Sequence, residues 1–265
     1  MADEKVLLSE HNDGVLTLTL NRPRKLNAMS HEVFGALNAA ISAASADRTL
    51  RVVIITGAGT TFSAGADLDM VREFSSLDLA PETFRATLRN MQSVFDRLEQ
   101  LEKPVIAAIN GACVGGGVDL ALACDLRIAV TDAFMMIPEV RLGIIPDLGA
   151  TQRLPRLIGV SRAKDLILTG RRVGADECLA MGLVNRVVPR EQLATALTEM
   201  TTDLKAGAPL AVGLAKQAID RAWATEIRTG EELEAHLQAP LYRTDDVREG
   251  YAAFRERRQR KWTGR

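Results

Sequence analysis

Residues 103–129 read KPVIAAINGACVGGGVDLALACDLRIA, and their pattern indicates the fold class. The apolar run 104–109 predicts a short buried strand, and 126–130 predicts another. Between them, the glycines that begin at Gly111 predict a turn, and 118–123 predicts a buried helix. This order of strand, turn, helix and strand is typical of an α/β protein.

The sequence on both sides predicts an N-terminal α/β core and a helical C-terminal third. A stripe of apolar residues with a period of 3.6 predicts a helix from about Pro81 to Leu101, and Ser30 is expected to cap an earlier helix. Further strands are predicted at 15–20, 52–56, 134–137 and 184–188. After Gly149 the pattern predicts helices at 150–158, 161–168, 175–181, 191–206, 209–224 and 244–259.

Composition excludes several classes of function. The 265 residues carry 33 basic and 34 acidic side chains, so a net charge of -1 favours neither nucleic acid nor membrane surfaces as partners. No apolar run approaches the length of a membrane span, and the N-terminus lacks the basic and apolar regions of a signal peptide. Cys113, Cys124 and Cys178 form no CxxC pair and are expected to be buried in a reduced, cytoplasmic protein.

Metal, triad and nucleotide chemistry are also disfavoured. The three histidines, His11, His31 and His236, lie in polar segments, which argues against a zinc site or a Ser-His-Asp triad. The chain has no P-loop motif, and Gly57 and Gly59 do not continue into a dinucleotide fingerprint. Carboxylates and backbone amides therefore remain as the expected catalytic groups.

Three segments combine such groups. FSAGADL (62–68) offers small residues that let a ligand approach the backbone, and GGGVD (115–119) places free N–H groups at a helix start. IPEVRLGIIPDLGATQRLP (137–155) sets Glu139 and Asp147 among Met136, Ile137, Ile144 and Ile145, where desolvation should raise a carboxyl pKa. Taken singly, Asp119 could be only a first-turn acid, and Asp147 only a turn or cap residue near Ala150.

Together with NRPRKLNAM (21–29) and EGYAAFRERR (249–258), these segments resemble the crotonase superfamily of enoyl-CoA hydratases and isomerases over nearly the whole chain. The resemblance implies an α/β fold, a spiral of ββα units over residues 1–200 with a helical oligomerisation region at 201–265. It also implies a homotrimer or homohexamer that acts on acyl-CoA thioesters. Neither a metal nor a cofactor is expected beyond the coenzyme A of the substrate.

The resemblance also assigns roles to individual residues. The backbone N–H groups of Ala64 and Gly116 would hold the thioester oxygen in an oxyanion hole. The CoA moiety would lie along five residues of two segments, namely Arg24, Leu26, Ala66, Asp67 and Leu68.

The carboxylates leave the reaction open. Hydratases of this superfamily place glutamates at the positions of Asp119 and Glu139, and a small residue at that of Asp147. The set found here is similar to that of Δ3,5-Δ2,4-dienoyl-CoA isomerases of fatty-acid degradation. Glu139 would then serve C2 and Asp147 would serve C6, or the reverse, while Asp119 tunes the pair.

Two alternatives to the isomerase remain. The first is an enoyl-CoA hydratase that adds water to a trans-2-enoyl-CoA. The second is a non-catalytic acyl-CoA-binding or RNA-binding relative. Its basic cluster would be the C-terminal residues Arg255, Arg257, Arg258, Arg260 and Lys261, with Phe254 and Trp262 as the only aromatic neighbours. A solvated helix end also explains this cluster.

Overall fold

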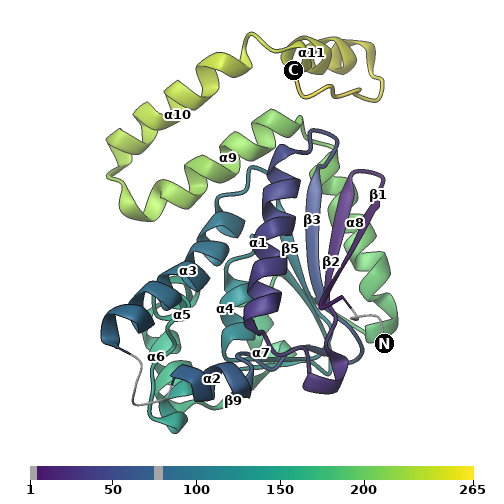
Figure 1. Ribbon diagram of the computed structural model, residues 1–265. Helices are drawn as coiled ribbons and strands as arrows, with labels where there is room; N and C mark the ends of the chain where they lie inside the picture. Colours follow the sequence, from purple (N-terminus) through teal and green to yellow (C-terminus); the bar gives the residue numbers. More distant parts are fainter. Residues whose placement is uncertain (1–4, 75–79) are drawn as a thin grey trace.

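The computed structural model describes residues 5–74 and 80–265, and its centre is a six-stranded sheet (Figure 1). The strand order is β1-β2-β3-β5-β7-β10, with β1 antiparallel to β2 and the other neighbours parallel. The strands are β1 (Leu7–Asn12), β2 (Val15–Leu20), β3 (Val52–Gly57), β5 (Val105–Ile109), β7 (Leu126–Val130) and β10 (Arg186–Val188). The strands predicted at 15–20, 52–56, 104–109, 126–130 and 184–188 are thus confirmed, and β1 at the sheet edge was not predicted.

A second, four-stranded sheet has the order β4-β6-β8-β9. Its strands are β4 (Thr61–Ser63), β6 (Ala112–Val114), β8 (Phe134–Met136) and β9 (Arg172–Gly174). Along the chain, β3, β5 and β7 are each followed by a short strand of this second sheet and then by helix. The chain therefore repeats a ββα unit, as the resemblance implied.

The core helices cover both faces of the large sheet. They are α1 (His31–Ala46), α2 (Leu68–Phe74), α3 (Pro81–Glu99), α4 (Gly116–Leu122), α5 (Ala150–Ile158), α6 (Val160–Thr169), α7 (Ala175–Ala180) and α8 (Leu193–Lys205). Side chains of β3 alternate between the faces, with Val53 and Ile55 in the main core cluster and Val52 and Ile54 in a second one. Met200 of α8 belongs to the second cluster, so α8 closes that face.

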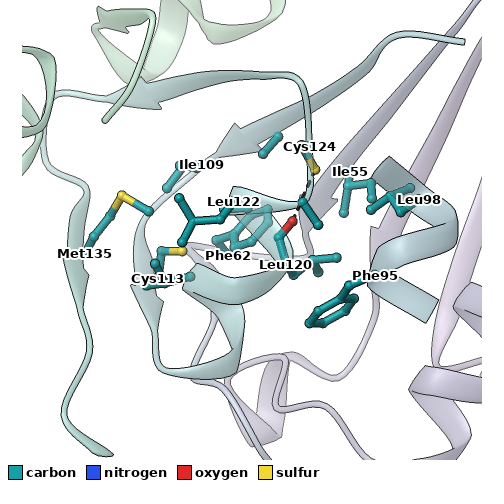
Figure 2. Packing of buried hydrophobic residues seen from close by; sticks show 14 of the residues in the cluster. Ile55, Phe62, Phe95, Leu98, Ile109, Cys113, Leu120, Leu122, Cys124 and Met135 are labelled. Carbon is teal, nitrogen blue, oxygen red and sulfur yellow. Dashed lines mark hydrogen bonds between the residues drawn. The ribbon is translucent and has the colours of Figure 1, made fainter. Parts of the chain in front are cut away.

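The helix α4 lies at the centre of the main cluster. All of its residues are buried, and Leu120 and Leu122 are drawn among Phe62, Ile109 and Phe95 in Figure 2. Cys124 donates a weak hydrogen bond from Sγ to the Leu120 carbonyl at 3.3 Å. All three cysteines are buried free thiols, as expected, and the buried α4 gives the glycine turn before it a rigid support.

A tight turn links the two sheets beside this support. The Asn110 side chain donates to the carbonyls of Gly57 (2.8 Å) and Gly59 (2.9 Å). Gly111 lies so close to the Thr60 carbonyl that a Cβ there would overlap it. The ends of β3 and β5 are thereby held side by side, and β4 and β6 leave them toward the candidate site.

The C-terminal helices lie outside this core (Figure 1). They are α9 (Pro209–Arg221), α10 (Ile227–Leu241) and α11 (Asp245–Glu256). The sequence predicted α9 and α11, but it left out α10, which has no buried residue and contains Pro240. The helix α8, which packs on the sheet, ends at Lys205. The role of the helices after it in oligomerisation is a proposal.

No helix in the described part of the chain is long and apolar enough to cross a membrane. The side chains of His11, His31 and His236 are exposed, in agreement with the sequence interpretation. Ser30 does precede α1, but its hydroxyl makes no capping hydrogen bond. It is instead a buried oxygen without a hydrogen-bond partner.

Candidate active site

Three carboxyl groups from three successive elements of the chain lie close enough to influence one another. Asp119 belongs to α4, Glu139 begins the 3-10 turn η2 (Glu139–Leu142), and Asp147 precedes α5. The charges of Glu139 and Asp147 both raise the pKa of Asp119. The structure therefore gathers the three acids that the sequence singled out.

Asp119 is the most deeply buried of the three, with 1% of its surface exposed. Its Oδ1 accepts a hydrogen bond from the Ala150 backbone N–H at 2.6 Å, so the carboxyl caps α5 from a neighbouring helix. Burial raises its pKa to about 7, and the Ala150 hydrogen bond only partly offsets that effect. Near neutral pH this group is divided between its acid and base forms, and only its Oδ2 remains for a substrate or water.

Glu139 and Asp147 also have raised pKa values, chiefly because burial penalises their charged forms. The Glu139 Oε1 lies against the backbone of Gly115, and its Oε2 is buried without a hydrogen-bond partner. The sequence attributed this desolvation partly to Ile144 and Ile145. The expected desolvation is confirmed, but Ile144 and Ile145 are themselves more than half exposed, and the backbone of Gly115 lies against the Glu139 carboxyl.

We predict that Asp119→Asn stabilises the protein at alkaline pH. The folded-state pKa of Asp119, about 7, lies above the ordinary 3.8, so ionising it costs stability progressively as pH rises from about 4 to 7. Asparagine removes this penalty and keeps an oxygen to accept from Ala150. The gain in Tm over the wild type should be larger at pH 8 than at pH 5, and equal gains at both would contradict the raised pKa.

The backbone corrects one residue of the expected oxyanion hole. The Ala64 N–H donates to the Leu26 carbonyl at 2.9 Å, so it is not available to a thioester oxygen. Met29 bonds to Gly65 O (2.7 Å) and accepts from Asp67 N (2.9 Å), which turns the Ala66 N–H away from residue 29. Among the described residues, no hydrogen-bond partner takes up the Ala66 N–H.

The Ala66 nitrogen lies close to Gly116, the other expected donor. This nitrogen lies 3.7 Å from the position that a Cβ on Gly116 would take. Gly116 is the first residue of α4, where an N–H has no partner within the helix. Ala66 and Gly116 therefore carry two neighbouring N–H groups without an acceptor in the described chain, and the Glu139 carboxyl lies against Gly115 beside them. The sequence could not separate Ala64 from Ala66, because both flank Gly65 and only the pairing with Met29 decides which N–H is free.

The two expected CoA segments lie side by side, joined by the Ala64–Leu26 hydrogen bond and by the pairing of Met29 with Ala66. Arg24, Leu26 and Leu68 are exposed, as a ligand-binding edge requires. Asp67 differs, since it is only 3% exposed and its carboxylate pairs with Arg22 at 2.7 Å. A backbone hydrogen bond from Asp69 and the Arg22 guanidinium hold the pKa of Asp67 below its ordinary value. Asp67 thus joins its own segment to that of Arg22 by an ion pair, and its buried carboxylate is not exposed to a ligand.

The structure offers little support for a metal site or for an RNA-binding surface. Within residues 5–74 and 80–265, no cluster of His, Cys, Asp and Glu could hold a metal ion. In the C-terminal basic cluster, Arg258 is paired with Glu249 and Glu256, and the Trp262 indole donates to the Ala206 carbonyl at 2.8 Å. Part of the cluster is thus engaged within the chain.

Comparisons with known proteins bear on this geometry. The enoyl-CoA hydratase/isomerase family model matches residues 10–265. A short-chain-enoyl-CoA hydratase of Clostridium acetobutylicum is 40% identical, with 96% of this chain and 95% of the relative covered. A crotonyl-CoA hydratase of Syntrophomonas wolfei is 38% identical, with 98% of each covered.

A crystal structure of an enoyl-CoA hydratase from Bacillus anthracis superposes with a TM-score of 0.92, at 39% identity and with 98% of this chain and 100% of that chain covered. The names of these relatives favour the hydratase alternative over the dienoyl-CoA isomerase. The match of sequence, fold and order of elements shows that this chain belongs to the enoyl-CoA hydratase/isomerase family of the crotonase superfamily.

Proposed function

We propose that this chain hydrates short-chain trans-2-enoyl-CoA thioesters. The observation that carries this proposal is the buried carboxyl pair of Asp119 and Glu139 beside the free amides of Ala66 and Gly116. The relatives named as short-chain and crotonyl-CoA hydratases support the same substrate class. The reaction needs no group beyond water and the CoA thioester.

The site residues divide the work as follows. Glu139 in its ionised form takes a proton from water as the water oxygen attacks C3. Negative charge then develops on the thioester oxygen, which accepts hydrogen bonds from the Ala66 and Gly116 N–H groups. Asp119 holds the water through its remaining Oδ2, and one of the two carboxyls returns a proton to C2. Arg24, Leu26 and Leu68 contact the CoA moiety.

A specific residue favours a second candidate, the Δ3,5-Δ2,4-dienoyl-CoA isomerase. Asp147 adds a half-buried third acid, and its charge raises the pKa of Glu139. A base and an acid with separated pKa values can move a proton between C2 and C6 of a conjugated chain. Measuring turnover of crotonyl-CoA and of a 3,5-dienoyl-CoA by the same preparation decides between the two. Hydration faster than isomerisation supports the proposal, and the reverse overturns it.

Asp147→Asn should separate these reactions. If Asp147 transfers a proton only in the isomerisation, the variant should lose isomerase activity by about 10² or more while hydration of crotonyl-CoA falls much less. Binding of butanoyl-CoA, measured by calorimetry, should stay close to that of the wild type, because the amides and the CoA edge are unchanged. An equal loss of both reactions would instead place Asp147 in the hydration step.

We also propose a homotrimer or homohexamer, in which the C-terminal helices pack against other copies. Ile219 and Trp223 on and after α9, Ile227 on α10, and Tyr251 and Phe254 on α11 are all more than half exposed. Such a set of apolar side chains is unusual for the surface of a monomer. Light scattering at micromolar concentration should give three or six times the 28.8 kDa chain mass, and a monomer mass would contradict the proposal.

A further inference from the structure

Side chains of three helices form hydrogen bonds with the backbone of the segment that carries Asp147. Gln92 of α3 donates from Nε2 to the Asp147 carbonyl at 2.6 Å. Arg153 of α5 donates from Nη1 to the next carbonyl, that of Leu148, at 3.2 Å. The Asp119 carboxyl accepts from Ala150, the third residue after Asp147. One catalytic acid and two other side chains thus fix consecutive parts of residues 147–150.

Arg153 is itself held rigidly. Its Nη2 lies 2.8 Å from both Asp96 Oδ1 and Glu99 Oε2 of α3, and its Nε lies 3.2 Å from Glu99 Oε2. Only 14% of the Arg153 side chain is exposed, while Asp96 and Glu99 are 53% and 40% exposed, so the guanidinium is the buried partner of these pairs. Gly149, which has φ +120°, lies so close to the Arg153 guanidinium that a Cβ there would overlap Nη1. The segment and the guanidinium are therefore closely fitted.

Gln92 and Arg153 do not face the amides of Ala66 and Gly116. Both line a cavity of about 940 Å³ bounded by α3, α5 and α9, and Leu148 and Gly149 line it as well. Leu148 also packs beside Gly116, with its Cδ1 3.4 Å from the position of a Cβ there. Leu148 thus lines this cavity and also packs beside Gly116, while Gln92 and Arg153 bond to the carbonyls of residues 147 and 148.

We propose that Gln92 and Arg153 are positioning residues, which hold residues 147–150 so that the carboxyls of Asp147 and Asp119 stay aligned with Glu139. This inference rests on the proposed function, because it assigns a catalytic consequence to the alignment. Misplacing a reacting group by about 1 Å can lower a rate about 100-fold. Loss of either side chain should therefore lower kcat and leave the KM for the thioester nearly unchanged.

The test compares Gln92→Met, which keeps the length but removes the donor, with Arg97→Met as the matched control. Arg97 lies on the same helix, but it bonds to Asn38 and Ser42 instead of the 147–150 segment. Gln92→Met should lower kcat for crotonyl-CoA about 10-fold to 100-fold. Hydrogen exchange at the Ala150 amide, measured with butanoyl-CoA bound, should also become faster. Arg97→Met should change neither.

Gln92→Glu adds a readout that general loss of structure would not produce. A protonated carboxyl can still donate to the Asp147 carbonyl, whereas an ionised one cannot. The kcat of this variant, divided by that of the wild type, should therefore fall as pH rises. A flat ratio, unchanged Ala150 exchange in Gln92→Met, or faster exchange with wild-type kcat would each overturn the positioning role. If the wild type turned over neither crotonyl-CoA nor a dienoyl-CoA, the proposed function would fail. The exchange rate of the Ala150 amide would still show whether Gln92 holds residues 147–150 in place.

Discussion

Glu139→Gln should lower kcat for crotonyl-CoA hydration by about 10²–10⁴, the range measured for a lost general acid or base. Glutamine matches glutamate in shape, so it preserves the packing against Gly115. It cannot accept a proton from water or return one to C2. Glu139 Oε2 is buried and has no hydrogen-bond partner in the described chain. No neighbouring group among the described residues is therefore already bonded to that oxygen and in place to take over its role.

The loss should be confined to the chemical step. The affinity for butanoyl-CoA, measured by calorimetry, should remain within a few-fold of the wild type, since the thioester oxygen and the CoA edge contact other residues. Glu191→Gln, which changes an exposed glutamate of the turn η3 (Arg190–Gln192), is the control and should retain the wild-type rate. A Glu139→Gln enzyme with near-wild-type kcat would remove Glu139 from the mechanism.

The long strands and most helices were predictable because their hydrophobic patterns are local. The runs in β3, β5 and β7 are buried on both faces, and α3 carries an apolar stripe of the expected period. The strand β1 was missed because most of its side chains are exposed, so its sequence LLSEHN shows no alternation. The helix α10 was missed because it has no buried face within the chain and contains Pro240.

The sequence predicted which segments form the site. It could not predict which atoms of those segments are free to bind a substrate, because that depends on contacts between residues far apart in the chain. Residue type and apolar context pointed to Glu139 and Asp147, whereas the role of Asp119 came from the resemblance to the crotonase superfamily. Whether Ala64 or Ala66 presents its N–H depends on pairing with Met29, which lies more than 30 residues earlier in the chain. The hydrogen bond that joins Asp119 to Ala150, and the one that joins Gln92 to Asp147, likewise link elements with no shared sequence pattern.

Gly116→Pro should lower kcat by about 10²–10³ relative to Gly116→Ala, because it deletes one N–H of the proposed oxyanion hole. Gly116 begins α4, and proline is tolerated at a first helical position, where the N–H has no partner in the helix. The preceding Gly115 has no Cβ to clash with the proline ring. The substitution therefore removes a hydrogen-bond donor without breaking the helix.

The comparison with Gly116→Ala separates the change at this nitrogen from the cost of adding a Cβ. A Cβ at position 116 would lie 2.9 Å from Met29 Cε and 3.4 Å from Leu148 Cδ1, so both variants must displace the flexible end of Met29. Alanine keeps the N–H, whereas proline lacks it and places its ring Cδ where the thioester oxygen would lie, so the rate difference between the two measures the loss of the oxygen site at the Gly116 nitrogen. Circular dichroism and Tm should show both variants folded. Equal kcat values for two folded variants would mean that the thioester oxygen does not use the Gly116 amide, and the paired role of Ala66 would fall with it.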